Sequence, residues 1–279
     1  MNEHILTFGP GKRLVGTLSQ PTSGARNTAI LLLNAGVIRR MGPHRINVKL
    51  ARSLTSQGFT VLRLDMSGLG DSLPSDAPLS FEQQAVADLK AAMDHLQRIG
   101  GAQQFALFGI CSGAHHGIAT AMADARLKAL WLMDTHAYPT SKTLWVRARR
   151  QLALDFTGTL GRWAMKSLRS LTARLHRSDA SPETPAMLRD DAHPMPGKAD
   201  FAQRIQSLID MRVRLQLVYT GGMFWRYNHR SQWQDAFRAH GAVATVPCDF
   251  LPDVDHTAST LHAQRRLIES TTRFATLLP

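Results

Sequence analysis

Cysteine and long apolar runs are both scarce in this chain of 279 residues. Cys111 and Cys248 are its only cysteines, too few for a disulfide framework, which is typical of a reducing compartment. No stretch reaches the roughly 18 consecutive apolar residues of a membrane-spanning helix. The start of the chain also lacks the basic and apolar segments of a signal peptide. We therefore expect a cytoplasmic protein, with one core built from its 44% apolar residues.

Acidic residues are few: 21 Asp and Glu stand against 33 Lys and Arg, which gives a formal charge of +12. Nine of the basic residues and a single acid, Asp155, fall between Lys142 and Arg177. This segment is either the solvated side of a cap, or a site for an anionic membrane surface or for the phosphate of CoA or phosphopantetheine. Because no nucleic-acid recognition motif occurs, we expect no binding to nucleic acid.

Short apolar runs alternate with segments of helical length. After a hairpin of residues 5–18, the expected strands are 29–33, 59–64, 105–108, 127–133, 213–219 and 243–248, and the expected helices are 46–57, 80–99, 231–239, 260–277 and one from about 112. This alternation predicts an α/β fold with a doubly wound, mainly parallel eight-stranded sheet. The pattern breaks between 136 and 200, so we expect a core of residues 1–135 and 201–279 with a helical cap insertion, 136–200.

The sequence Gly-Ile-Cys-Ser-Gly joins a predicted strand to a predicted helix. It matches the Gly-x-nucleophile-x-Gly elbow, with Cys111 where serine is usual. The residues two before and two after an elbow nucleophile face each other closely, so both must be small. Gly109 and Gly113 meet this condition around Cys111, whereas Ile110 would not meet it around Ser112. We therefore predict Cys111 as the nucleophile; the alternative is a buried structural cysteine.

The partners of the nucleophile are expected at the carboxyl ends of other strands, where sites of parallel sheets collect. Among 12 histidines, His256 follows the last predicted strand, in the chain order nucleophile, acid, histidine. The usual acid position after the penultimate strand is empty, because no acid occurs between Asp210 and Asp235. We predict that Asp134, at the end of the strand after the elbow helix, orients His256. The open alternatives are Asp253, Asp255 and Asn228.

An oxyanion hole needs two backbone N–H donors. We expect one from Val37, in the Ala-Gly-Val loop after the first buried strand, and one from Ser112, directly after the nucleophile. Gly36, His115 and Trp145 are the residues that we expect to contact the substrate. Together these groups predict a site for acyl transfer.

These residues resemble the α/β-hydrolase superfamily from about residue 28 to the end, apart from the insertion. The elbow and the stretches 34–36 (Asn-Ala-Gly), 42–45 (Gly-Pro-His-Arg) and 62–72 (Leu-Arg-Leu-Asp-Met-Ser-Gly-Leu-Gly-Asp-Ser) are similar to a bacterial branch. That branch holds the serine-aminopeptidase-like and exosortase-associated hydrolases. A cysteine in the elbow is also similar to dienelactone hydrolase. The sequence departs from the usual pattern at the nucleophile and at the acid.

The resemblance implies cleavage of a small-molecule carboxylic ester or thioester through an acyl-enzyme on Cys111, with His256 as base. It implies no metal and no organic cofactor. It also implies that the insertion is a cap that covers the site and shapes an acyl pocket. Two alternatives stay open: an acyltransferase that uses the same acyl-enzyme, and a catalytically silent fold that binds a membrane surface or a ligand.

Overall fold

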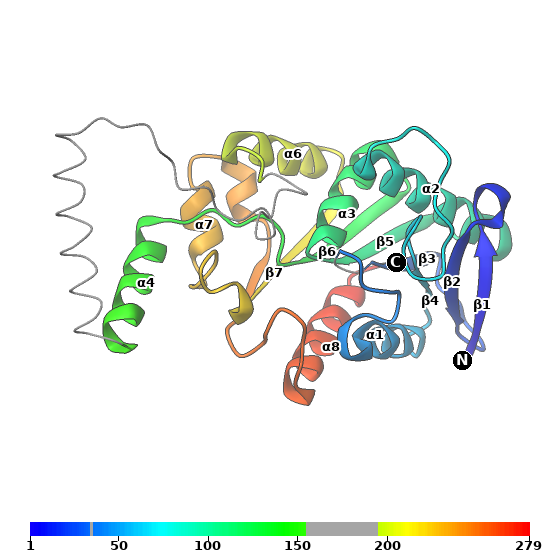
Figure 1. The fold of residues 1–279 in the computed structure, drawn as a ribbon, viewed down its shortest axis with the longest axis horizontal. Helices are drawn as coiled ribbons and strands as arrows, with labels where there is room; N and C mark the ends of the chain where they lie inside the picture. Colours follow the sequence, from blue (N-terminus) through cyan, green and yellow to red (C-terminus); the bar gives the residue numbers. More distant parts are fainter. Residues whose placement is uncertain (34–35, 155–194) are drawn as a thin grey trace.

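The computed structural model describes residues 1–33, 36–154 and 195–279 (Figure 1). Its strands are β1 (Asn2–Phe8), β2 (Leu14–Gln20), β3 (Thr28–Leu33), β4 (Thr60–Leu64), β5 (Gln104–Ile110), β6 (Leu127–Met133), β7 (Arg214–Thr220) and β8 (Cys248–Leu251). They form one eight-stranded sheet in the order β1-β2-β4-β3-β5-β6-β7-β8. The β1–β2 and β2–β4 pairs are antiparallel and the other neighbours are parallel. The predicted fold class is confirmed.

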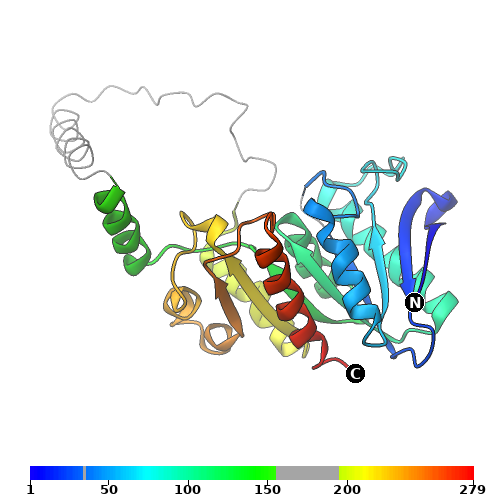
Figure 2. The ribbon, with the colours of Figure 1, turned by 90° about the horizontal axis from the view of Figure 1, so that it is seen from below.

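Helices cover both faces of the sheet. Those described are α1 (Ile46–Thr55), α2 (Phe81–Gly100), α3 (Ser112–Ala123), α4 (Ser141–Leu154), α6 (Lys198–Asp210), α7 (Gln232–Phe237) and α8 (Leu261–Ala275). α1 and α8 pack together on one face, and α2, α3 and α6 lie on the other (Figures 1 and 2). All parallel strands therefore end on one edge of a sheet with helices on both faces, where a site can form.

The side-chain alternation of β3 explains why two separate cores form. Its six residues are all buried. Leu31 and Leu33 join the core under α2, α3 and α6, whereas Ile30 and Leu32 join the core under α1 and α8. Because successive side chains of a strand point to opposite faces, a continuous apolar run is required when both faces are covered. Each such buried side chain contributes about 2 kcal/mol by removal from water.

Local signals account for the other elements. A capping box is present at α2, where Ser80 Oγ accepts from the N–H of Gln83 and Gln83 Oε1 accepts from the N–H of Ser80. The predicted N-terminal hairpin is confirmed as β1 and β2. Each pairing satisfies backbone groups that would otherwise be left without a partner.

The last strand begins later than predicted. The expected strand 243–248 is wrong, because residues 241–245 form a short 3₁₀ helix, η5 (Gly241–Thr245), and β8 is Cys248–Leu251. Pro247 explains the difference. It has no N–H to donate, so its only backbone contribution is the carbonyl that accepts from Leu217 N at 2.9 Å, and the ladder with β7 starts there.

The predicted cap insertion, 136–200, is described only in part. α4 and the start of α6 lie in it, and residues 155–194 lie outside the described residues. α4 projects from the body of the molecule at the end opposite to β1 (Figures 1 and 2). None of the helices in the described ranges combines the length and the apolar character needed to cross a bilayer.

Candidate active site

Cys111 lies at a sharp turn between β5 and α3. Its φ of 54° and ψ of −115° are unusual for a residue with a side chain. Such a conformation costs about 1–3 kcal/mol and persists only where the surroundings fix it. Here Cys111 N donates to Met133 O at 2.8 Å and Cys111 O accepts from Ala114 N at 3.0 Å. The turn places the partly exposed Cys111 at the carboxyl edge of the sheet and at the N-terminus of a helix.

The glycines on either side of Cys111 are required by close contact. A Cβ atom on Gly109 would lie 2.4 Å from the carbonyl oxygen of Gly113, well inside contact distance. This oxygen belongs to the backbone, so it cannot move aside cheaply. This observation supports the register in which Cys111, and not Ser112, occupies the exposed position of the elbow.

The structure brings His256 and Asp134 together from distant parts of the chain. The Nδ1 atom of His256 lies 2.7 Å from Oδ2 of Asp134. Asp134 follows β6 directly and its side chain is fully buried. Its Oδ1 accepts from Thr220 N at 2.8 Å, and its Oδ2 accepts from Thr220 Oγ1 at 2.7 Å. The carboxylate is therefore held by backbone and hydroxyl donors of β7 while it faces the imidazole ring.

The pKa of His256 is raised from 6.5 to about 10. The largest cause is the hydrogen bond to Asp134, followed by a hydrogen bond to Cys111, and burial opposes both. The second cause indicates that the predicted nucleophile lies near the ring as well as the acid. Because Nδ1 faces Asp134, Nε2 is the ring nitrogen left for the thiol. At neutral pH the imidazole carries a proton, and an imidazolium stabilises a neighbouring thiolate.

The alternative orienting residues have other partners. Asp253 pairs with His262 at 2.6 Å and with Arg266 at 3.1 Å. Asp255 accepts from the N–H and hydroxyl groups of the residues that follow it in its own turn. Asn228 Nδ2 donates to the carbonyl of Thr143. Of the four residues considered, Asp134 is the one hydrogen-bonded to His256.

The usual acid position lies in the 3₁₀ helix η4 (Gly221–Met223), and close packing leaves no room for a side chain at its two glycines. A Cβ atom on Gly221 would lie 2.2 Å from the carbonyl oxygen of Pro252. A Cβ atom on Gly222 would lie 2.5 Å from the backbone nitrogen of His256. The loop after β7 therefore supports the backbone that carries the histidine, and the carboxylate comes from the neighbouring strand.

The loop after β3 is tied to the elbow by Ser112. Gly36 N donates to Ser112 Oγ at 2.7 Å, and Gly36 has a φ of 50°. Ser112 is the first residue of α3, where backbone N–H groups have no partner within the helix. The side chain of Val37 is 81% exposed beside this contact. The predicted donors are thus on segments that touch each other, while Asn34 and Ala35 lie outside the described residues.

Comparison with known proteins identifies the family. A sequence profile described as the alpha/beta hydrolase fold matches residues 31–241, well over half of the chain. The chain belongs to the α/β-hydrolase family. No curated protein matches it.

Solved structures share this fold at low sequence identity. An esterase from Pyrococcus furiosus aligns with a TM-score of 0.58 and 14% identity over 99% of this chain and 92% of its own. An esterase from Thermogutta terrifontis gives 0.57 and 16%, over 99% and 98%. A thioesterase domain from the curacin biosynthetic pathway gives 0.56 and 14%, over 99% and 100%. At these identities the likeness concerns the fold of the α/β-hydrolase family.

A buried ion pair that the sequence analysis missed braces the loop after β3. Arg40 N donates to Asp65 Oδ1 at 2.6 Å, and its guanidinium contacts both Asp65 and Asp71. Arg40 Nε also donates to Thr17 Oγ1 at 3.1 Å. The side chain of Asp65 is fully buried, so it needs these partners. The signal in the sequence was the pair of acids in the loop after β4, close to an arginine-rich loop.

The predicted substrate contacts His115 and Trp145 lie on different elements. His115, on the first turns of α3, stacks on His136 with ring centroids 3.8 Å apart. Both line a cavity of about 390 Å³ between α2, α3 and α6, together with Phe81, His116, Phe201 and Arg204. Trp145 lies on α4, is 60% exposed and has the guanidinium of Arg149 5.5 Å from its ring centroid. Within the described ranges, no three His, Cys, Asp or Glu side chains converge as metal ligands would.

Proposed function

We propose that this chain cleaves a carboxylic ester or thioester through an acyl-enzyme on Cys111. The observation that carries the proposal is a histidine whose Nδ1 lies 2.7 Å from a buried carboxylate and whose pKa is raised by that carboxylate and by the elbow thiol. This is the arrangement that activates a nucleophile for acyl transfer. The esterases and the thioesterase with the same fold are consistent with it.

The raised pKa of His256 fits a nucleophile of the cysteine type. Asp134 is the largest cause of the rise, Cys111 adds to it and burial opposes both. An imidazolium beside a thiol favours the thiolate, which is the nucleophilic form of cysteine.

The reaction then runs in two steps. The Cys111 thiolate forms a C–S bond to the carbonyl carbon, and the N–H groups of Ser112 and Val37 hold the oxyanion. The bond to the leaving alcohol or thiol breaks as that group takes the proton from Nε2 of His256. Water then attacks the acyl-enzyme and gives a proton back to Nε2, and the C–S bond breaks to release the acid and the thiolate. An alcohol, amine or thiol in place of water would make the same enzyme an acyltransferase.

The test is intact-protein mass spectrometry after brief exposure to a p-nitrophenyl ester and to an acyl-CoA. We expect one acyl adduct on Cys111 in wild type and neither adduct nor turnover in Cys111→Ala. Cys248→Ala is the matched control, since burial raises the pKa of Cys248 to about 12 and its thiol lies 3.3 Å from Tyr227 Oη. An adduct that survives in Cys111→Ala, or turnover that does, would refute the proposal. Acid as product indicates hydrolysis, and transfer to an added amine or alcohol indicates the acyltransferase.

A further inference from the structure

A groove with mainly basic walls lies between the edge strand β1 and the helix α1. Its volume is about 560 Å³, within the range of small-molecule sites. Of the described residues that line it, four are arginines (Arg40, Arg45, Arg52 and Arg63) and one, Glu3, is an acid. We call it the arginine groove. Its walls come from β1, β2, β4, α1 and the loop before α1, so it lies apart from the elbow that follows β5.

The register of the strands and the period of the helix bring these side chains together. Thr17 of β2 pairs with Ile5 of β1 and with Arg63 of β4, so the three side chains point to the same face of the sheet. Arg45 and Arg52 are seven residues apart, about two helical turns, and so lie on one side of α1. The groove forms where this side of the helix meets that face of the sheet.

Arg63 is a buried arginine with an unused donor. Its side chain is only 5% exposed, and its Nη2 donates to Glu3 Oε1 at 2.5 Å. Among the described residues, its buried Nε has no hydrogen-bond partner. A buried N–H without an acceptor is unfavourable, and a ligand oxygen in the groove would remove that cost.

The carboxylate of Glu3 is shared by two guanidinium groups. Its Oε2 accepts from Arg52 Nη2 at 3.3 Å, while its Oε1 accepts from Arg63. Burial lowers the pKa of Arg63, Glu3 opposes this effect, and the charges of Arg40 and Arg52 lower the pKa further. Because a guanidinium keeps its proton in proteins, the repulsion stays, and an added negative charge would relieve it.

The other two arginines of the groove differ in their pairing. Arg40 is neutralised by Asp65 and Asp71. Arg45 is exposed and makes no ion pair within the part of the chain that the structure describes. Without Arg40, three guanidinium groups face the single carboxylate of Glu3, which leaves two positive charges uncompensated. Arg45 also precedes the first turn of α1, which carries no acid, so the positive end of the helix dipole adds to this surplus.

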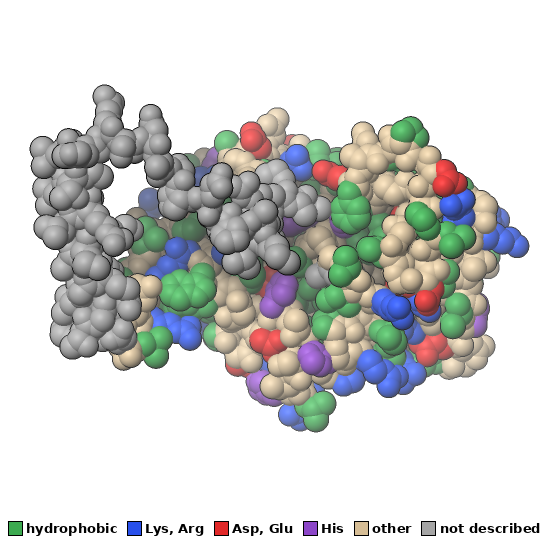
Figure 3. Space-filling view, viewed as in Figure 1, with side chains coloured by type: hydrophobic (Ala, Val, Ile, Leu, Met, Phe, Trp, Pro, Cys, Tyr) green, Lys and Arg blue, Asp and Glu red, His purple; other side chains and the backbone are tan. Residues whose placement is uncertain are grey.

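Apolar side chains border the charged walls. Ile5 and Met41 line the groove and are both exposed. Figure 3 shows Lys and Arg side chains over α1, at the end of the molecule that carries β1, with hydrophobic side chains beside them. A ligand with an apolar body next to its anionic group would remove this apolar surface from water as well.

We propose that the arginine groove binds the phosphate monoester group of a molecule with an apolar body. A phosphate monoester carries about 1.5–2 negative charges at neutral pH and three acceptor oxygens, which suit two uncompensated guanidinium groups and a free N–H. Arginine binds phosphate oxygens through pairs of its donors. A carboxylate brings one charge only and should bind more weakly. This inference does not rest on the proposed chemistry, since an inactive protein would bind equally.

The experiment is isothermal titration calorimetry with phenyl phosphate, inorganic phosphate and benzoate as the probes. We expect phenyl phosphate to bind more tightly than the other two, because it alone combines the dianion with an apolar body. Arg63→Lys keeps the charge but loses the paired donors, so it should bind phenyl phosphate about tenfold more weakly or worse. Arg45→Gln removes an exposed charge and should weaken binding about threefold.

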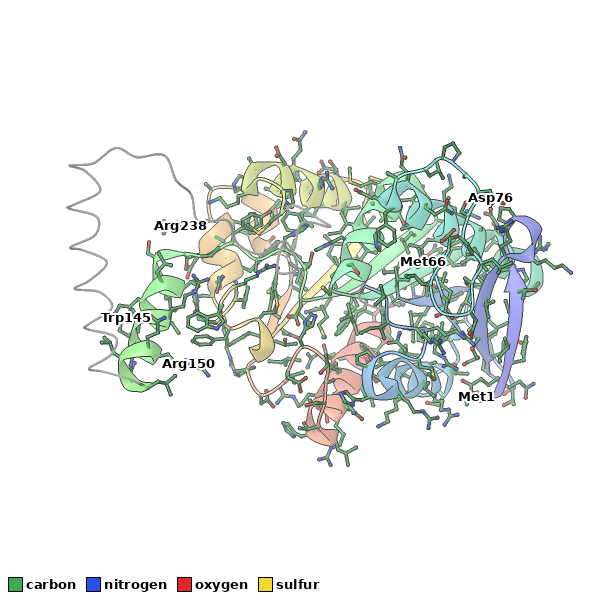
Figure 4. All side chains as sticks on the ribbon, viewed as in Figure 1. Met1, Met66, Asp76, Trp145, Arg150 and Arg238 are labelled. Atoms are coloured by element: carbon green, nitrogen blue, oxygen red, sulfur yellow. The ribbon has the colours of Figure 1, made fainter. Side chains whose placement is uncertain are left out.

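The matched control is Arg238→Gln, which removes the same charge from an exposed position at the end of the molecule opposite to Met1 and β1 (Figure 4). It should bind phenyl phosphate as wild type does. Thermal melting checks that each variant is folded, and Arg45→Gln keeps the test valid if Arg63→Lys is not.

Phosphatidic acid carries the same monoester, so co-sedimentation with phosphatidylcholine vesicles that contain it separates two sources of the group. Binding of phenyl phosphate assigns the ligand to soluble molecules. Binding to the vesicles that Arg45→Gln weakens, without binding of phenyl phosphate, assigns it to a lipid headgroup. Binding to neither, benzoate as tight as phenyl phosphate, or the same loss in Arg238→Gln as in Arg45→Gln would overturn the inference.

Discussion

Replacing Asp134 by asparagine tests the site most directly, because it removes one charge and almost no volume. The carboxylate is the largest cause of the raised pKa of His256, so that pKa should fall from about 10 toward 6.5. The asparagine amide would also present an N–H to Nδ1. This contact favours the imidazole tautomer that carries its proton on Nε2, and that tautomer cannot accept the proton of the Cys111 thiol at Nε2.

The size of the effect of Asp134→Asn follows from the shift in the pKa of His256. A change in pKa from 6.5 to about 10 corresponds to about 5 kcal/mol before screening. The ring of His256 is 34% exposed, so water reduces this value, and we expect the pairs with Asp134 and Cys111 to contribute about 2–3 kcal/mol. In Ser-His-Asp enzymes the same replacement costs roughly 10⁴ in kcat. A thiolate depends less on its base, so we expect a loss of about 10²–10³ in kcat/KM.

The assay is the pH dependence of kcat/KM for an activated ester between pH 5.5 and 9, a window that the pKa of His256 makes informative. Wild type needs the imidazolium, which persists up to about pH 10, so its activity should not fall at the alkaline end. In Asp134→Asn the alkaline fall should begin near pH 6.5 and become about tenfold per unit above about pH 7.5. Thr220→Val is the matched control: it removes one donor to Asp134 but keeps the charge, so the profile should keep its shape. An unchanged alkaline profile in Asp134→Asn would refute the reasoning.

Three further substitutions probe the elbow, the loop after β3 and the histidine. Gly109→Ala should destabilise the fold by about 2 kcal/mol or more, because its Cβ would meet a backbone carbonyl at 2.4 Å. Gly100→Ala is the control: it has open space around it and should melt at or above the wild-type temperature. Ser112→Ala removes the acceptor of Gly36 N–H and should lower kcat/KM about 5–10-fold, with Ser112→Thr retaining most of the activity. His256→Gln should lower the stability of the fold most near pH 6. The reason is that a histidine with a raised pKa stabilises the fold fully below pH 6.5 and progressively less up to about pH 10. A larger loss of stability at the alkaline end of a series of thermal melts would contradict this sign.

The sequence was sufficient to predict the fold because it depends on local patterns, and the nucleophile register, which stays a prediction, rests on a local pattern too. Strands buried on two faces must be continuously apolar, and an elbow must carry small residues on both sides of its nucleophile. The hydrogen bond between Asp134 and His256 was predictable for a different reason, since the loop after β7 contains no acid and the strand ends of a parallel sheet lie side by side. The start of β8 was mispredicted because periodicity alone does not register that Pro247 lacks a donor.

Contacts between loops were beyond the sequence analysis. The hydroxyl of Ser112 accepts from Gly36, 76 positions earlier, and Arg40 reaches Asp65 and Asp71 across the carboxyl edge. Neither contact leaves a periodic signal, because each depends on the paths of two loops and not on the repeat of one element. Both act on the loop that is expected to donate to the oxyanion, so the unpredicted contacts lie where precision of position affects rate most.

The position of the acid follows from how closely the loop after β7 approaches the histidine. With Gly222 against the backbone of His256, a side chain there would push away the residue that it was meant to orient. The carboxylate that contacts the histidine comes instead from the end of β6, the next strand along the carboxyl edge, where Asp134 adopts a φ of 53°. β7 still takes part, since Thr220 gives both its N–H and its hydroxyl to Asp134. β6 thus supplies the carboxylate and β7 fixes its orientation. The acid can therefore lie outside its usual position and still keep its hydrogen bond to the imidazole ring.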